Sequence, residues 1–309
     1  MMKQLSMIAA ATLIAATLAT TASAQSSYGS YGSYDSYDSS SGDSCASGSP
    51  TRSSFDRSRT LQVVGLTGDN RLVCFNEFAP RDARNINFVS NLSGGDTFLI
   101  GIDFRVQDRR LYGVGNAGGV YMIDTSNAVA TLVNRLSVAL DGSESYGVDF
   151  NPAADRLRIT SSRGQNLRHN LNPGGVTIAD GALNYAPGTT ALGIVGSAYT
   201  NNDLDANTAT TLYALDSTLD QIALQSPPNN GTLAATGKLT VDASLVAGFD
   251  IYSKIRDGVT VEVQALASIK AADGSIGLYS VRLPTGKATS RGSFGANVVT
   301  DIAIPLNQL

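Results

Sequence analysis

The sequence predicts an all-β domain in which a unit of about fifty residues occurs five times, as the blades of a five-bladed β-propeller. Five short segments resemble one another: GIDF at 101–104, GVDF at 147–150, SAYT at 197–200, GFDI at 248–251 and TDIA at 300–303. Aligned on the aspartate, or on Tyr199 in the third copy, they lie 46, 50, 51 and 51 residues apart. A period near 50 with strand-like content is typical of propeller blades.

Each unit contains several short strand candidates in succession. In the first complete unit they are LIGIDF at 99–104, RLYGV at 110–114, VYMID at 120–124 and ATLV at 130–133. Runs of β-branched and aromatic residues between turns rich in Gly, Asn and Asp are typical of an antiparallel meander. Long apolar stripes with the period of a helix are missing, so we expect few helices.

The two ends of the repeat array complement each other. Three strand candidates, 61–66, 71–75 and 86–90, precede the first inner strand, and an inner strand at 298–304 follows the last complete unit. We expect this C-terminal strand to complete the N-terminal blade, because closing the ring removes exposed sheet edges.

The first 59 residues have a different composition. Residues 1–24 combine Lys3, an apolar run and the triplet Ala22-Ser23-Ala24, which is the pattern of a secretory signal peptide. Residues 25–59 are rich in Ser, Tyr and Gly, and we expect a disordered tail there. The expected organisation is therefore a signal peptide at 1–24, a tail at 25–59 and a propeller at 60–309. We expect a secreted protein, periplasmic or on the cell surface if the source is bacterial.

Charge and cysteine content narrow the classes of partner. The formal net charge is −4 and no run of Lys and Arg occurs, which argues against nucleic acid and anionic membranes. The two cysteines, Cys45 and Cys74, would pair in an oxidising compartment and staple the tail to the first blade, with two free thiols as the alternative. We expect no insertion into a membrane, and a monomer.

The aspartates of the repeated segments form the first candidate site. We expect Asp103, Asp149, Asp250 and Asp301 to approach the central axis together, because they occupy equivalent places on inner strands. Such a ring could bind Ca²⁺, which takes about six to eight oxygen ligands. We favour a structural role instead, in which the carboxylates accept hydrogen bonds from neighbouring backbone N–H groups. Catalysis has the least support, since a catalytic pair needs carboxylates in different environments.

The third unit departs from the pattern of the others. Besides Tyr199 in place of an aspartate, it carries an unusual polar set: Arg156, Arg158, Arg163, Gln165, Asn166, Arg168 and the sole histidine, His169. Charge-assisted bonds from such residues could hold a carboxylate or a sugar. The candidate ligand-binding residues are Arg156, Arg158, Gln165, Asn166 and Arg168. The alternative, which we favour, is a set of inter-blade salt bridges to the repeated aspartates.

Several motifs also resemble those of a known family. They are LTxDNRL at 66–72, IGIDFR at 100–105, DRLR at 155–158, GQNLR at 164–168 and LQxPPNxGTL at 224–233. Over about 61–304 the chain resembles the uncharacterised secreted domain-of-unknown-function family numbered 4394, found mostly in bacteria. The resemblance implies a propeller-like exported domain without an assigned activity, and it provides no catalytic residues.

Two functions from different classes are compatible with these observations. We expect a non-catalytic binding or interaction module for a glycan, a surface protein or a small ligand, without a cofactor unless Ca²⁺ binds the aspartates. The alternative is a secreted hydrolase acting on glycans or lactones, with a site at the channel mouth, and it rests on fold analogy. We lean against an enzyme, because no acid–base, nucleophile or metal-ligand set stands out.

Overall fold

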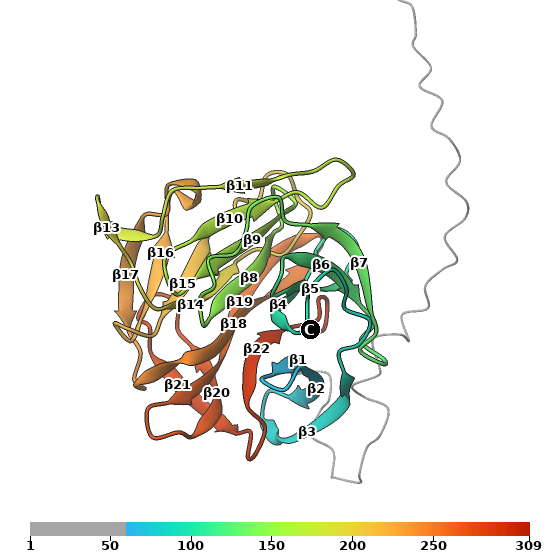
Figure 1. The fold of residues 1–309 in the computed structure, drawn as a ribbon. Helices are drawn as coiled ribbons and strands as arrows, with labels where there is room; N and C mark the ends of the chain where they lie inside the picture. Colours follow the sequence, from blue (N-terminus) through green and yellow to red (C-terminus); the bar gives the residue numbers. More distant parts are fainter. Residues whose placement is uncertain (1–59) are drawn as a thin grey trace, which may run out of the picture. The chain divides into compact units, whose positions relative to one another are not determined.

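The computed structural model describes residues 60–309, which form five four-stranded antiparallel sheets arranged as a ring (Figure 1). The predicted signal peptide at 1–24, the tail at 25–59 and Cys45 lie outside the described residues. The five sheets are called blades 1 to 5. Blade 1 consists of β22 (Val299–Ala303), β1 (Gln62–Thr67), β2 (Arg71–Asn76) and β3 (Ala79–Phe88).

The other blades follow in chain order, each beginning at the centre of the ring. Blade 2 consists of β4 (Leu99–Phe104), β5 (Leu111–Gly115), β6 (Gly119–Ile123) and β7 (Ala130–Arg135). Blade 3 consists of β8 (Tyr146–Asn151), β9 (Arg156–Ser161), β10 (Asn166–His169) and β11 (Thr177–Ala179). Blade 4 consists of β14 (Ile194–Tyr199), β15 (Leu212–Asp216), β16 (Gln221–Gln225) and β17 (Leu233–Lys238). Blade 5 consists of β18 (Ala243–Arg256), β19 (Val259–Ala271), β20 (Ile276–Val281) and β21 (Ala288–Ser293).

The ring closes by pairing the last strand of the chain with the first. β22 runs antiparallel to β1, with Asp301 opposite Leu66 and Ile302 opposite Gly65. The inner strands β22, β4, β8, β14 and β18 then contact one another in that order around the ring. The predicted all-β, five-bladed propeller and its mode of closure are confirmed.

Apolar clusters fill four of the five interfaces between blades. Side chains of blades 1 and 2, blades 2 and 3, blades 4 and 5, and blades 5 and 1 form one shared cluster each. The fifth cluster joins blade 4 to Leu183 and Ala191, which belong to the segment linking blades 3 and 4. No residue of blade 3 takes part in that cluster, so the interface between blades 3 and 4 is of a different kind.

Three details differ from the sequence-based expectations. β3 spans Ala79–Phe88 instead of 86–90, because its polar, outward-facing residues lack the apolar alternation that marks a strand. β12 (Asn184–Ala186) and β13 (Thr189–Thr190) form a small additional hairpin between blades 3 and 4. β18 and β19 are 14 and 13 residues long and form a long hairpin.

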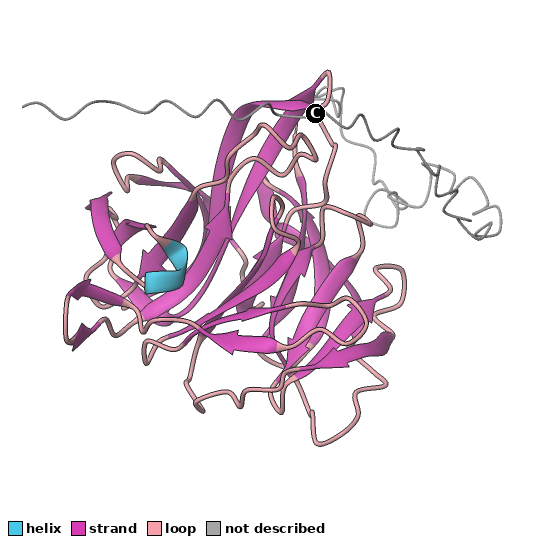
Figure 2. Cartoon of the chain, turned by 90° about the horizontal axis from the view of Figure 1, so that it is seen from above, coloured by secondary structure: helices cyan, strands magenta, loops and turns pink. Residues whose placement is uncertain are grey.

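Helical structure is almost absent from the described part of the chain. Figure 2 shows strands throughout, together with one short helical turn, the 3₁₀ helix η3 (Pro228–Asn230). Among the described residues, none of the helical structure has the length and apolar character needed to cross a bilayer.

Candidate functional site

The four repeated aspartates lie on inner strands, and each one links its blade to the next. Asp103 of blade 2 accepts a hydrogen bond from Phe150 N of blade 3 (2.7 Å). The equivalent bonds run from Tyr199 N to Asp149 (3.1 Å), from Ile102 N to Asp301 (2.8 Å) and from Ile304 N to Asp250 (2.6 Å). The carboxylates therefore satisfy backbone N–H groups at four of the five junctions between inner strands.

The remaining junction, between blades 4 and 5, uses a different residue. β14 ends in Tyr199 instead of carrying an aspartate, and Asn202 bridges to β18 in its place. Its backbone N donates to Ser253 Oγ (3.0 Å), and its side-chain Nδ2 donates to Ile251 O (3.1 Å).

The central aspartates form a concentrated set of buried acids. Their residues are only 3–6% exposed, and oxygens of Asp103, Asp149 and Asp250 lie within 4.8 Å of one another. Burial, followed by repulsion from neighbouring carboxylates, raises the pKa of Asp103 and Asp149 well above the usual range. Burial raises the pKa of Asp250 to about 6, and it raises the pKa of Asp301 as well.

The arrangement of the buried aspartates favours protonated carboxyl groups and hydrogen bonds from backbone N–H groups. Asp103, Asp250 and Asp301 each use both oxygens to accept backbone N–H groups, and Asp149 uses one. Among the described residues, Asp103, Asp149 and Asp250 are the three that could ligate a metal together. Their similar environments do not provide the contrast between an acid and a base that hydrolysis requires.

Four residues of the polar set share one face of blade 3: Arg156, Arg158, Asn166 and Arg168. Arg158 on β9 pairs with Arg168 on β10, which pairs with Ile178 on β11. Since alternate residues of a strand share a face, Arg156 lies beside Arg158 in the next row. The contacts of Arg158 with blade 4 identify this face as the one that meets blade 4.

A buried ion-pair network occupies the interface between blades 3 and 4. Arg158, 3% exposed, donates from Nη1 to Asp180 Oδ2 (2.7 Å) and to Asn166 Oδ1 (2.8 Å). Its Nη2 donates to Asn229 Oδ1 (2.9 Å), and its Nε donates to Tyr199 Oη (3.3 Å). All three nitrogens are thus bonded, as a buried guanidinium requires. Arg158 and Asn166, predicted as ligand residues, are engaged here within the protein.

The repeated aspartates are not the partners of these arginines. Arg168 donates from Nε to Asp180 Oδ1 (3.0 Å), so Asp180 bonds to both Arg158 and Arg168. Gln165 lies at the opposite end of the blade, where Nε2 donates to Ala139 O (2.8 Å) and Oε1 accepts from Asp141 N (3.2 Å). Asp180 is the central acceptor of the network, and no sequence pattern singled it out.

Arg156 and Arg168 line a shallow recess of about 220 Å³ on this face. The other lining residues are Asn170, Gly174, Gly175, Val176 and Ile178. Arg168 uses only Nε toward the protein, while Arg156 donates from Nη1 to the carbonyl oxygens of Ala154 (3.1 Å) and Asp155 (2.7 Å). Each guanidinium therefore keeps N–H groups without a partner among the described residues.

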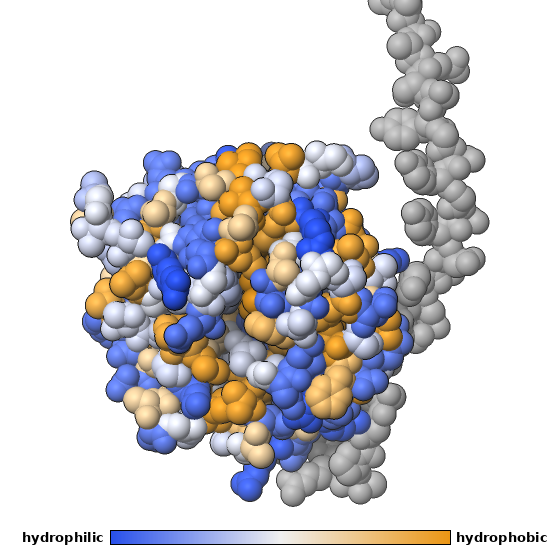
Figure 3. Space-filling model, in the orientation of Figure 1, coloured by the Kyte–Doolittle hydropathy of each residue, from blue (hydrophilic) through white to orange (hydrophobic). Residues whose placement is uncertain are grey.

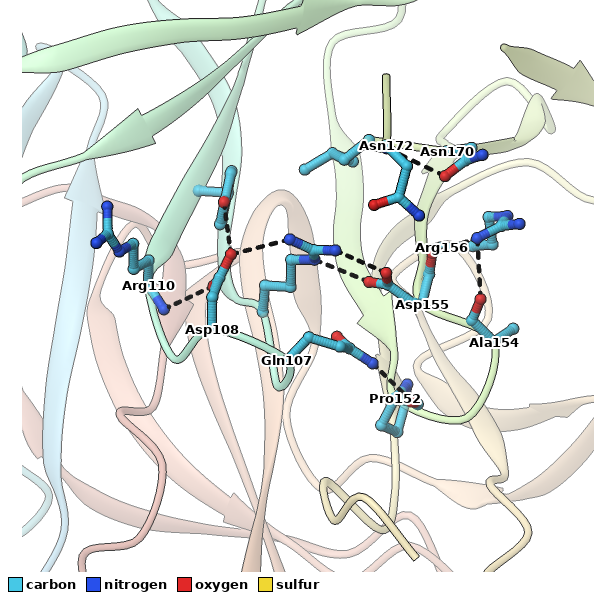
Figure 4. Close-up of polar contacts among 12 residues, drawn as sticks. Gln107, Asp108, Arg110, Pro152, Ala154, Asp155, Arg156, Asn170 and Asn172 are labelled. Carbon is cyan, nitrogen blue, oxygen red and sulfur yellow. Dashed lines mark hydrogen bonds and ion pairs between the residues drawn. The ribbon is translucent and has the colours of Figure 1, made fainter. Parts of the chain in front are cut away.

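A second ion-pair cluster lies beside the recess and joins blades 2 and 3. Arg105 donates from Nε and Nη2 to the two oxygens of Asp155 (2.8 and 2.6 Å), and from Nη1 to Asp108 (2.9 Å). Asp155 has a φ of 50°, in the left-handed region that aspartate tolerates better than most residues. Arg156 and Asn170 lie on the far side of Asp155 from Asp108 (Figure 4). The Asp155 carboxylate pairs with Arg105, and among the described residues it forms no ion pair with Arg156.

Two further candidates of the sequence lie in the core. His169 is fully buried, with Nδ1 3.0 Å from Thr177 Oγ1, and burial lowers its pKa to about 4. It is therefore neutral at physiological pH. Cys74 is buried on β2, and since Cys45 lies outside the described residues, their disulfide stays a prediction.

Comparison with solved structures shows only distant similarity. A protein of unknown function from Bacteroides thetaiotaomicron has 13% sequence identity and a TM-score of 0.42; the match covers 74% of this chain and 55% of that one. An auxiliary nutrient binding protein from Bacteroides ovatus has 12% identity and a TM-score of 0.36; that match covers 72% of this chain and 56% of the other. Similarities of this degree carry no argument about function.

Sequence comparison gives a more definite result. No curated protein matches the chain. One family model does, over residues 71–303, from β2 to the end of β22, and so takes in nearly the whole propeller. The chain therefore belongs to the family described as "Domain of unknown function (DUF4394)".

Proposed function

We propose that this protein is an exported, non-catalytic binding module, and that its ligand is a small anionic molecule held in the recess of Arg156 and Arg168. Export is inferred from the signal-peptide pattern of residues 1–24. The observation that carries the proposal is the pair of guanidinium groups that line one recess with unused N–H groups.

The charge balance around the recess supports an anion. Asp180 is shared between Arg158 and Arg168, so one carboxylate faces two cations. Arg105 engages Asp155 through two bonds, which leaves Arg156 without a carboxylate partner among the described residues. Arg105 also pairs with Asp108, so four guanidinium groups face three carboxylates around the recess. One positive charge is thus in excess, and guanidinium groups bind carboxylates by charge-assisted bonds.

The difference between the interfaces of the blades also favours a ligand site at the recess. Four interfaces between blades are apolar clusters built from both neighbours, and the interface beside the recess is polar. Ligand sites commonly combine a few placed polar groups with a rigid frame. The buried network of Arg158 and Asp180 is such a frame, because it fixes the sheet from which Arg168 extends.

The test is direct binding of small anions to the purified protein at low salt. Acetate, glucuronate, sulfate and phosphate are titrated by calorimetry into the parent and into the variants Arg156→Ala and Arg168→Ala. Each variant should lose at least about tenfold in affinity, the equivalent of one charge-assisted bond. Arg163→Ala is the matched control, because Arg163 is exposed on the same blade in the turn between β9 and β10. Failure of all four anions to bind, or an equal loss in Arg163→Ala, would contradict the proposal.

A further inference from the structure

We infer that the recess selects a carboxylate that carries an aliphatic group, such as a branched short-chain acid or the C-terminus of a peptide ending in an aliphatic residue. This inference rests on the proposed function and names the ligand class of the same site. It follows from which side chains share the recess with the two arginines, and from how charge is distributed behind them.

The first step is the position of two exposed aliphatic side chains. Ile178 lies directly opposite Arg168 in the register of β10 and β11, and Asn170 N bonds to Val176 O (3.2 Å). Val176 is 57% exposed and Ile178 is 43% exposed, and both line the recess. In Figure 3, hydrophobic side chains gather over the part of the molecule where Figure 1 places β10 and β11. Covering such side chains removes apolar surface from water and favours a ligand that brings an apolar group.

The second step is the separation of the charged and apolar walls. In each of two neighbouring rows an arginine lies nearer the centre of the ring and an aliphatic residue lies further out: Arg168 with Ile178, and Arg156 with Val176. A ligand that satisfies both walls therefore has its anionic group toward β9 and its apolar group toward β11. Acetate, with a single methyl group, and sulfate, with no apolar part, use little more than the charged half of the recess.

The third step is the preference for one negative charge. Asp180 lies behind Arg168, with Oδ1 bonded to its Nε. This carboxylate repels a second negative charge on a ligand that approaches Arg168, while the free edge of the guanidinium still matches the planar shape of a carboxylate. A monocarboxylate is thus favoured over phosphate or sulfate.

The turn between β10 and β11 leaves room for the apolar group. Gly174 has a φ of 76°, and a Cβ placed there would have no atom within 4 Å. Gly175 is held close to the carbonyl of Asn170, where a Cβ would lie 2.1 Å from the oxygen. At Gly174 and Gly175 the turn therefore presents backbone, without side chains, at the edge of the recess.

The experiment compares a series of ligands on the same protein by calorimetry. Isovalerate should bind at least about tenfold more tightly than acetate, since it adds three carbon atoms that Val176 and Ile178 can cover. Isovalerate should also bind more tightly than glucuronate or sulfate. N-acetylleucine distinguishes the sources: tighter binding than isovalerate indicates a peptide C-terminus, and weaker binding indicates a free acid. N-acetylleucinamide, which lacks the carboxylate, should not bind.

A double variant separates this inference from the proposed function. Val176→Thr replaces a methyl group by a hydroxyl, Ile178→Thr replaces an ethyl group by a hydroxyl, and together they should bring the affinity for isovalerate down to the affinity for acetate measured on the same variant. Val133→Thr on β7, an exposed valine of blade 2, is the control and should change nothing. Equal affinity for isovalerate and acetate, with both lost in Arg168→Ala, would overturn the inference and leave the proposed function standing. Absence of binding by every anion would overturn both.

Discussion

Replacing Asp250 by asparagine should change the stability of the propeller by an amount that depends on pH. Burial raises the pKa of Asp250 from 3.8 to about 6 in the folded protein. A carboxyl with a raised pKa stabilises the fold in its protonated form, so this contribution is complete below pH 3.8 and is lost as pH rises through 6. Between pH 4.5 and pH 7.5 the loss amounts to about 2 kcal/mol. Asparagine does not titrate and removes this dependence.

The substitution also has a cost that does not depend on pH. The two oxygens of Asp250 accept Ile251 N and Ile304 N, and in asparagine one of these N–H groups faces an amide group instead. A buried unsatisfied donor costs about 1–3 kcal/mol. The variant should therefore be less stable than the parent at pH 4.5, and this deficit should shrink by about 2 kcal/mol at pH 7.5.

Urea unfolding at the two pH values measures the deficit, with tyrosine fluorescence as the probe, since the chain has twelve tyrosines and no tryptophan. The difference between variant and parent at each pH cancels the titrating groups outside the central cluster of aspartates. A deficit that is equal at both pH values would refute the raised pKa. A deficit that grows with pH would show that the ionised form is stabilised, as a bound cation would do.

Three further predictions concern the central aspartates, His169 and Arg105. Addition of Ca²⁺ and then EDTA should leave the unfolding temperature unchanged, because backbone N–H groups already satisfy the central carboxylates; a rise that EDTA reverses would assign a metal to them. Burial lowers the pKa of His169 from 6.5 to about 4, so the stability that the neutral imidazole contributes is lost as pH falls from 6.5 toward 4. In urea unfolding, the free energy of unfolding of His169→Gln should therefore rise by about 2 kcal/mol relative to that of the parent between pH 7 and pH 5. An unchanged difference between the two proteins would contradict this. Arg105→Ala should lower the free energy of unfolding by about 1–3 kcal/mol, and Arg105→Lys should restore it only partly, because lysine lacks the planar fork that Asp155 accepts; full restoration would contradict this reason.

The fold could be predicted because its signals are local and repeated. Four of the five inner strands carry the same apolar pattern around an aspartate. The inner strand at 298–304 has no further strands after it, and the strands at 61–90 have no inner strand before them, so the sequence pairs the two. The extent of β3 was only partly predicted because just one of its ten residues is buried, so the alternation of buried apolar and exposed polar residues that marks a half-buried strand is missing. β12 and β13 were not predicted because strands of three and two residues are too short to show an alternating apolar pattern.

The candidate site could be predicted only in part, because its partners are distant in sequence. The polar set of the third unit was visible, and the structure divides it: Arg156 and Arg168 line the recess, while Arg158 and Asn166 are buried in the interface. That division depends on Asp180, which follows β11 and has no equivalent in the repeats. Sequence spacing alone does not show which carboxylate an arginine meets.

The crystal structure of the protein grown with isovalerate tests the central claim most directly. The account predicts the carboxylate in the recess of blade 3, within hydrogen-bond distance of the free guanidinium N–H groups of Arg168 and Arg156, with the branched group against Val176 and Ile178. Isovalerate bound elsewhere, such as at the mouth of the central channel, or an empty recess at saturating concentration, would contradict it.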